Sequence, residues 1–192
     1  MNWELVQVYL DALAGLRAPR RKNVEIARCV DREALEQNQP PEFLFVSGSR
    51  GRYNPKGVHC LYFSENKEIA QLEYMHLNRS PVGPTPPYTT FFADAYLAIL
   101  DLSKPGVLAT LGFTKRALHR HWRTITRATK AELLGLAISE QKRFSAIRFP
   151  SHAARACRRI GFNYAIFRDP MLETRSLLRV ETGVGIRSQR WP

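Results

Sequence analysis

A short apolar segment that runs directly into a helical pattern restricts how the middle of this chain can fold. Residues 58–63 (VHCLYF) predict a strand that is buried on both faces. Ser64 follows at once, and serine is a residue type that caps helix N-termini well. We therefore expect a strand that ends at Ser64 and, without a linker, a helix over residues 65–77.

The helix expected at residues 65–77 carries a carboxylate on its apolar side. On a 3.6-residue repeat, Glu73 lies between Ile69 and Leu77. The same face holds Leu72 and His76, and the opposite face holds Lys67, Gln71 and Tyr74. Taking a carboxylate out of water is costly unless the group is paired or functional. Glu73 should therefore either form a buried ion pair with one of the arginines or take part in the function.

Strand and helix patterns follow one another irregularly along the rest of the chain. Helices are expected at residues 3–16 and 114–127, from a capping box at Thr129–Glu132 to about Gln141, and from an N-cap at Ser151 to Gly161. Strands are expected at residues 23–30, 43–46, 96–102, 144–149 and 163–167, and a proline-rich loop at 79–90. Because this order lacks the regular alternation of a doubly wound parallel sheet, it predicts an α+β fold.

The length of 192 residues is typical of one domain. We expect an N-terminal helix and basic loop at residues 1–22, a core at 23–180 and a poorly ordered polar tail at 181–192. The first ten residues lack the basic cluster of a signal peptide, and no apolar run is long enough to span a membrane. The three cysteines form no C-x-x-C pair, so neither a metal site nor a disulfide framework is predicted, and a reducing cytoplasm fits best.

The net charge of +12 favours an anionic partner, which can be a nucleic acid, a phosphate-bearing small molecule or an acidic protein. Residues 115–130 contain six Lys or Arg and no acid. A basic helix with Trp122 fits a nucleic-acid-binding module without chemistry, which is the alternative function. The same pattern also fits a solvated basic face with Leu118, Trp122 and Ile125 packed inward.

The densest group of chemically useful residues lies between positions 47 and 73. Gly48 and Gly51 permit close approach of a ligand, and residues 54–57 form a turn. If Arg52 and Tyr62 flank one hairpin, strand pairing brings them together, with Glu73 on the helix that follows. A guanidinium, an aromatic hydroxyl and a carboxylate suit a nucleotide, and the carboxylate can stabilise positive charge that develops at a sugar carbon.

These residues also carry a family resemblance. The matching motifs are Arg52-Tyr53-Asn54, Gly57, Leu61-Tyr62, Ala70-Gln71-Leu72-Glu73, then the segment 146–151 (AIRFPS) and the strand 163–167. Together they resemble the RES domain, named for its arginine, glutamate and serine, over about residues 25–180.

The resemblance implies a fold like that of ADP-ribosyltransferase toxins, with mixed, mostly antiparallel sheets and flanking helices. It implies a toxin of a two-gene toxin–antitoxin system that cleaves NAD or transfers ADP-ribose to a protein, blocked by a helical DNA-binding antitoxin. The NAD-binding residues implied are Arg28, Arg52, Tyr53, Tyr62 and Ser151, and the catalytic residues implied are Glu73, Arg52 and Tyr62. Whether the acceptor is water, phosphate or a protein, and whether the scaffold is active, stay open at this point.

Overall fold

The computed structural model describes residues 2–17, 19–32, 45–46, 49–78, 85–119, 125–181 and 189–191. The helices are α1 (Trp3–Gly15), α3 (Lys67–Leu77), α4 (Pro105–Thr110), α5 (Lys130–Gln141), α6 (His152–Ala156) and α7 (Arg168–Glu173), with a 3-10 turn, η2, at Ala117–His119. The strands are β1 (Arg21–Asp31), β2 (Phe45–Val46), β3 (Cys60–Ser64), β4 (Tyr88–Asp101), β5 (Ala146–Pro150), β6 (Phe162–Phe167), β7 (Leu177–Glu181) and β8 (Gln189–Trp191).

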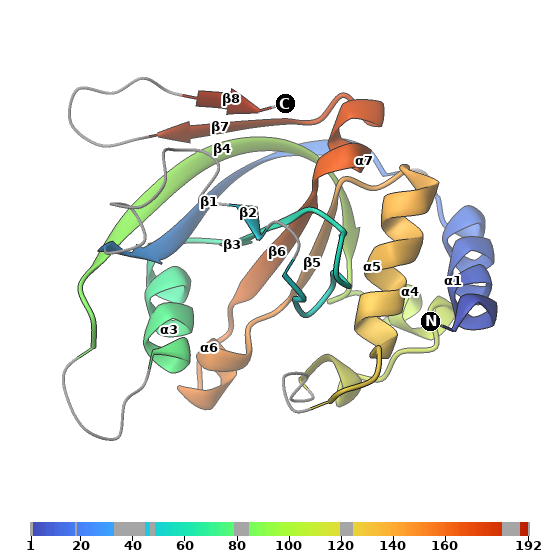
Figure 1. The fold of residues 1–192 in the computed structure, drawn as a ribbon, viewed down its shortest axis with the longest axis horizontal. Coiled ribbons are helices and arrows are strands. Elements are labelled where there is room, and N and C mark those ends of the chain that lie inside the picture. The colour runs from blue at the N-terminus through green and yellow to red at the C-terminus, as the bar shows by residue number, and fades with distance from the viewer. Residues whose placement is uncertain are drawn as a thin grey trace.

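All eight of these strands belong to one sheet, in the order β1-β3-β6-β5-β4-β7-β8, with β2 beside β3. The sheet closes on itself because β1 also pairs with β4. Each pairing is antiparallel except that of β4 with β5, which is parallel. Helices flank this mixed sheet, with α3 and α6 near one end and α1 and α5 at the other (Figure 1). The predicted α+β fold is therefore confirmed.

The two longest strands, β1 and β4, give the sheet its curved frame (Figure 1). They pair without interruption from Arg21 opposite Ala98 to Asp31 opposite Tyr88. In β4, buried residues alternate with more exposed ones from Phe91 to Leu97, which is the pattern of a strand with one face in a core. The sequence predicted only the second half of this strand, because the aromatic and threonine residues at its start adjoin a proline-rich loop.

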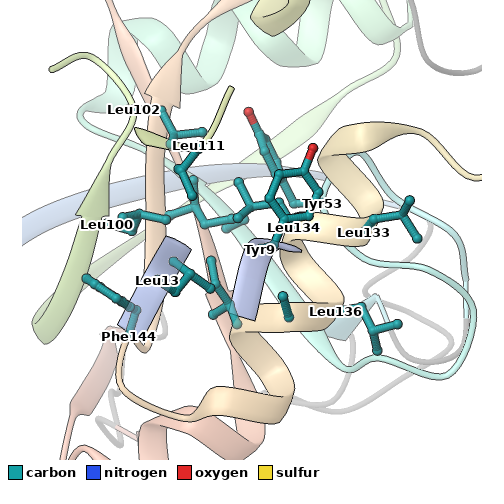
Figure 2. Close-up of a cluster of buried hydrophobic side chains, with 14 of the residues drawn as sticks. Tyr9, Leu13, Tyr53, Leu100, Leu102, Leu111, Leu133, Leu134, Leu136 and Phe144 are labelled. Atoms are coloured by element: carbon teal, nitrogen blue, oxygen red, sulfur yellow. The ribbon is translucent and has the colours of Figure 1, made fainter. Parts of the chain in front are cut away.

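Two hydrophobic cores occupy the two faces of the sheet. One holds inward-facing residues of β1, β3, β4, β6 and β7, including Ile26, Leu61, Leu97 and Ile166. The other packs α1 and α5 against the outer face of the sheet, as Figure 2 shows for Tyr9, Leu13, Leu100 and Leu134 among others. Burying one leucine side chain fully contributes about 1.5–3 kcal/mol, so these layers supply most of the stability of the fold.

Helix α5 is fixed at its start by the capping box that the sequence predicted. The side chain of Thr129 accepts a hydrogen bond from the backbone of Glu132, and the carboxylate of Glu132 accepts one from the backbone of Thr129. The helix then passes very close to the loop that follows β2. A Cβ atom on Gly135 would lie 1.5 Å from the carbonyl oxygen of Tyr53, so only glycine fits at this crossing.

The helix predicted at residues 114–127 is not formed in the parts of this segment that the structure describes, 114–119 and 125–127. There the chain forms the short turn η2 at Ala117–His119, and residues 125–127 are not helical. The carbonyl of Leu118 accepts a hydrogen bond from Arg52, and those of Ile125 and Arg127 accept from Arg50. These bonds occupy carbonyls that a helix would use internally. Leu118 is buried as expected, and Trp122 lies outside the described residues.

Several elements of the structure were not expected from the sequence. The short helices α4 and α7 and the strand β7 were not predicted. The expectation of a poorly ordered tail is wrong for Gln189–Trp191, which pairs with β7 as β8. Among the described residues, no helix combines the length and apolar character needed to cross a membrane.

Candidate active site

A cleft of about 340 Å³ opens between the sheet and helix α3. Its walls come from segments far apart in the sequence: β1, the loop before β3, β3 itself, α3, and the ends of β5 and β6 near α6. This volume is within the usual range for small-molecule sites. The chemically active side chains that line it are Arg28, Arg50, Arg52, Tyr62, Glu73, His76, His152 and Asn163.

The cleft lies where strand β3 changes its neighbour in the sheet. At Ser64, β3 pairs with Ala27 of β1, whereas at Cys60 and Leu61 it pairs with β2. The intervening Tyr62 lines the cleft opposite residues of β1 that follow Ala27. Away from this single ladder position, β1 and β3 do not pair with each other, and side chains of both strands line the cleft.

Helix α3 begins later than the sequence predicted, and it presents a different face to the sheet. Its N-cap is Asn66, whose side chain accepts a hydrogen bond from the backbone of Ile69. The buried residues are Ile69, Ala70 and Tyr74, so the prediction that Tyr74 lies on the outer face is wrong. Small Ala70 allows close packing, and the ring of Tyr74 lies 4.8 Å from that of Tyr88. This orientation leaves Glu73 at the border of the buried face.

Glu73 is half-buried and is held by two neutral donors. Its Oε1 atom accepts a hydrogen bond of 2.6 Å from the hydroxyl of Ser151 and one of 2.7 Å from the amide of Asn163. The amide is itself oriented, because its oxygen accepts a bond of 2.8 Å from the hydroxyl of Ser64. Neither donor neutralises the carboxylate, which therefore presents a fixed negative charge at the cleft wall.

Ser151 stands behind Glu73, not on the cleft surface. It is 1% exposed, and its hydroxyl also accepts a hydrogen bond from the backbone of Ala154, which confirms the predicted N-cap of α6. The structure places this predicted NAD-binding residue where it positions the carboxylate. Asn163, which lines the cleft, has the same effect on Glu73 and was not predicted as a site residue. The sequence did offer one indication of its importance, because Asn163 begins the strand 163–167 that resembles the RES domain.

Three arginines also line the cleft. Arg28 extends from β1, and burial lowers its pKa to about 10, so it stays charged at neutral pH. Arg52 donates from Nη1 to the carbonyl of Leu118 at 2.7 Å. Arg50, which the sequence analysis missed, forms a two-point ion pair with Glu132 at the start of α5. The sequence did not indicate this pairing, because Glu132 lies 82 positions after Arg50.

The expected hairpin between Arg52 and Tyr62 is wrong, although both residues line the cleft. Arg52 lies in the loop, and the strand that pairs with β3 on that side is β2. The loop is fixed instead by side chains: the hydroxyl of Tyr62 donates to Asn54 and accepts from the backbone of Tyr53, both at 2.8 Å. Burial raises the pKa of Tyr62 well above its ordinary value, so the hydroxyl keeps its proton. A Cβ on Gly51 would lie 2.8 Å from this hydroxyl, which explains glycine there.

Tyr53, like Ser151, is a predicted site residue that does not line the cleft. Its side chain is 1% exposed, and its ring lies 4.6 Å from that of Phe149. Only its backbone contributes, through the bond to Tyr62. His76 and His152 also line the cleft, with rings 5.2 Å apart, and neither was predicted as a site residue. Among the described residues, no His, Cys, Asp and Glu side chains cluster as metal ligands would.

The cleft combines three arginines and an aromatic ring with a carboxylate that two hydrogen bonds hold in place. Guanidinium groups bind phosphate oxygens well, and a carboxylate stabilises positive charge in its vicinity. The cleft can therefore bind a ligand that carries both a phosphate and a sugar, with the phosphate at the arginines and the sugar near Glu73.

Comparison with known families agrees with the motifs. The family model of the RES domain matches residues 27–182, from within β1 to just past β7. The matched range includes every residue that lines the cleft, Glu73 among them. No curated protein matches the chain. Because the match covers most of the sequence, the chain belongs to the RES domain family.

Proposed function

We propose that the protein cleaves the bond between nicotinamide and ribose in NAD, as the toxin component of a toxin–antitoxin system. The observation that carries the proposal is the carboxylate of Glu73, held by Ser151 and Asn163 in a cleft that arginines also line. Membership of the RES domain family supports it, since NAD-consuming toxins are what the resemblance implies. A helical DNA-binding antitoxin is the proposed partner.

In this proposal, Arg28 and Arg52 bind the pyrophosphate of NAD. The guanidinium group has five N–H donors, so Arg52 can hold a phosphate while one donor contacts Leu118. The ring of Tyr62 offers a surface for nicotinamide or the adjacent ribose. Its hydroxyl is engaged with Asn54, and contact through the ring leaves that bond intact.

Glu73 acts on the ribose. As the C1′–N bond breaks, nicotinamide leaves with the bonding electrons, and the sugar gains oxocarbenium character. The carboxylate stabilises that positive charge, and two hydrogen bonds keep it in position without rearrangement. An acceptor oxygen from water, phosphate or a protein then bonds to C1′ and loses its proton.

The test is release of nicotinamide from NAD by the purified chain, with products identified by mass spectrometry with and without phosphate or protein acceptors. Glu73→Gln should reduce release by about 10²- to 10³-fold, on the scale of lost electrostatic stabilisation. Glu68→Gln is the matched control, because Glu68 is exposed on the same helix and its substitution removes the same charge. Equal turnover by Glu73→Gln and wild type would refute the catalytic role.

A further inference from the structure

A second cavity, of about 290 Å³, lies on the other side of Ser151 from Glu73. Its lining combines an apolar floor, which includes Leu108 and Leu118, with three cationic side chains at Lys115, Arg155 and Arg159. Among the residues that the structure describes, no carboxylate lines it. The cavity is therefore a concave, positively charged site that shares no arginine with the active-site cleft.

The three cations are available to a ligand. Lys115, Arg155 and Arg159 are all exposed, and within the described part of the chain none of them forms an ion pair. Three carboxylates accept hydrogen bonds from residues of the cavity lining: Asp101 from Ser103, Glu73 from Ser151, and Glu65 from the backbone of Phe162. Arg148 pairs with both Asp101 and Glu65, and among the described residues no carboxylate pairs with the three cations of the cavity.

The backbone holds one of these cations, Arg159, at the rim. After α6 the chain turns through Arg158, which has a left-handed φ of 57°, and the backbone of Arg159 bonds to the carbonyl of Ala154. The turn directs Arg159 and the 88% exposed Ile160 to the edge of the cavity. Cations next to an apolar floor suit a ligand with an anionic end and a compact organic part.

We propose that this cavity binds a small phosphate ester, with the phosphate at Lys115, Arg155 and Arg159 and the organic part against the leucines. A phosphate monoester carries about −1.5 to −2 charge at pH 7 and three strong acceptor oxygens. Two guanidinium groups and one ammonium match that charge and geometry.

The experiment is calorimetric titration of the full chain with ribose 5-phosphate, free ribose and inorganic phosphate. The proposal requires ribose 5-phosphate to bind, ribose not to bind, and inorganic phosphate to bind more weakly. The double variant Arg155→Gln/Arg159→Gln should weaken ribose 5-phosphate binding at least tenfold. The control Arg158→Gln removes a charge from the same turn outside the cavity lining, and it should change the affinity less than twofold.

A further variant, Arg52→Gln, separates this cavity from the active-site cleft. Loss of ribose 5-phosphate binding in Arg52→Gln, with retention in the double variant, would place the ligand in the active-site cleft and overturn the proposal. An equal loss in Arg158→Gln and the double variant would indicate diffuse attraction by surface charge and would also overturn it. Neither result depends on whether the chain cleaves NAD.

Discussion

Replacement of Glu132 by glutamine should destabilise the protein by about 2 kcal/mol at neutral pH. Glu132 is 1% exposed and accepts two hydrogen bonds from Arg50, which is 30% exposed. Removal of one partner from a fully buried pair costs about 3–5 kcal/mol. The loss should be smaller here, because water reaches Arg50 and glutamine can still complete the capping box with Thr129. For a chain of this length, about 2 kcal/mol corresponds to a fall in Tm of about 4–8 °C.

The effect of the substitution should depend on pH. Burial alone would raise the pKa of Glu132, but hydrogen bonds from Arg50 and Thr129 lower it below its ordinary value. A carboxyl group whose pKa is lower in the folded state stabilises the fold above the pKa of the unfolded state, about 4.3. That stabilisation disappears as the pH falls through the folded pKa. The difference between wild type and Glu132→Gln should therefore shrink below about pH 4.

Urea denaturation at pH 7 and at pH 3 measures both expectations. Glu173→Gln is the control, because its ion pair with Lys142 is exposed on both sides and should contribute less than about 0.5 kcal/mol. A loss below about 0.5 kcal/mol for Glu132→Gln at pH 7 would refute the reasoning. So would a loss of the same size at both pH values.

Three further predictions follow from single contacts. In steady-state kinetics, Ser151→Ala should lower kcat for NAD by about 10- to 100-fold, because Glu73 loses a bond that positions it. In urea denaturation, the same variant should lose about 1 kcal/mol of stability, because the N-cap of α6 is lost. Gly135→Ala should prevent stable folding, seen as loss of the cooperative thermal transition, because its Cβ would meet the carbonyl of Tyr53 at 1.5 Å. Binding of NAD to Glu73→Gln should weaken as the pH rises through about 10, where Arg28 loses its charge, as calorimetry at pH 8 and pH 11 would detect.

The sequence predicted those features that depend on residues close together in the chain. The capping box of α5, the N-cap at Ser151 and the strand before α3 follow from residues a few positions apart. The same patterns put Arg52, Tyr62 and Glu73 close in sequence, and the structure brings them to one cleft. Their roles in NAD cleavage remain predictions.

The remaining features depend on contacts between distant residues. The basic segment from 114 to 127 has a helical spacing, but Arg50 and Arg52 bind its carbonyls. Tyr53 follows a cleft arginine in sequence, yet its ring fills a space beside Phe149 of β5. Asn163 is almost a hundred positions from Glu73, and only the sheet brings them together. No local pattern contains that information.

The closure of the sheet gives the cleft a mechanical property. Arg28 and Tyr62 stand on walls whose strands share a single ladder position, Ala27 opposite Ser64, beyond which β3 pairs with β2 instead. The two walls are joined at that position on one side and through β4, β5 and β6 on the other, because the sheet closes on itself. The spacing between Arg28 and Tyr62 is therefore set by a closed ring of strands and not by one pairing.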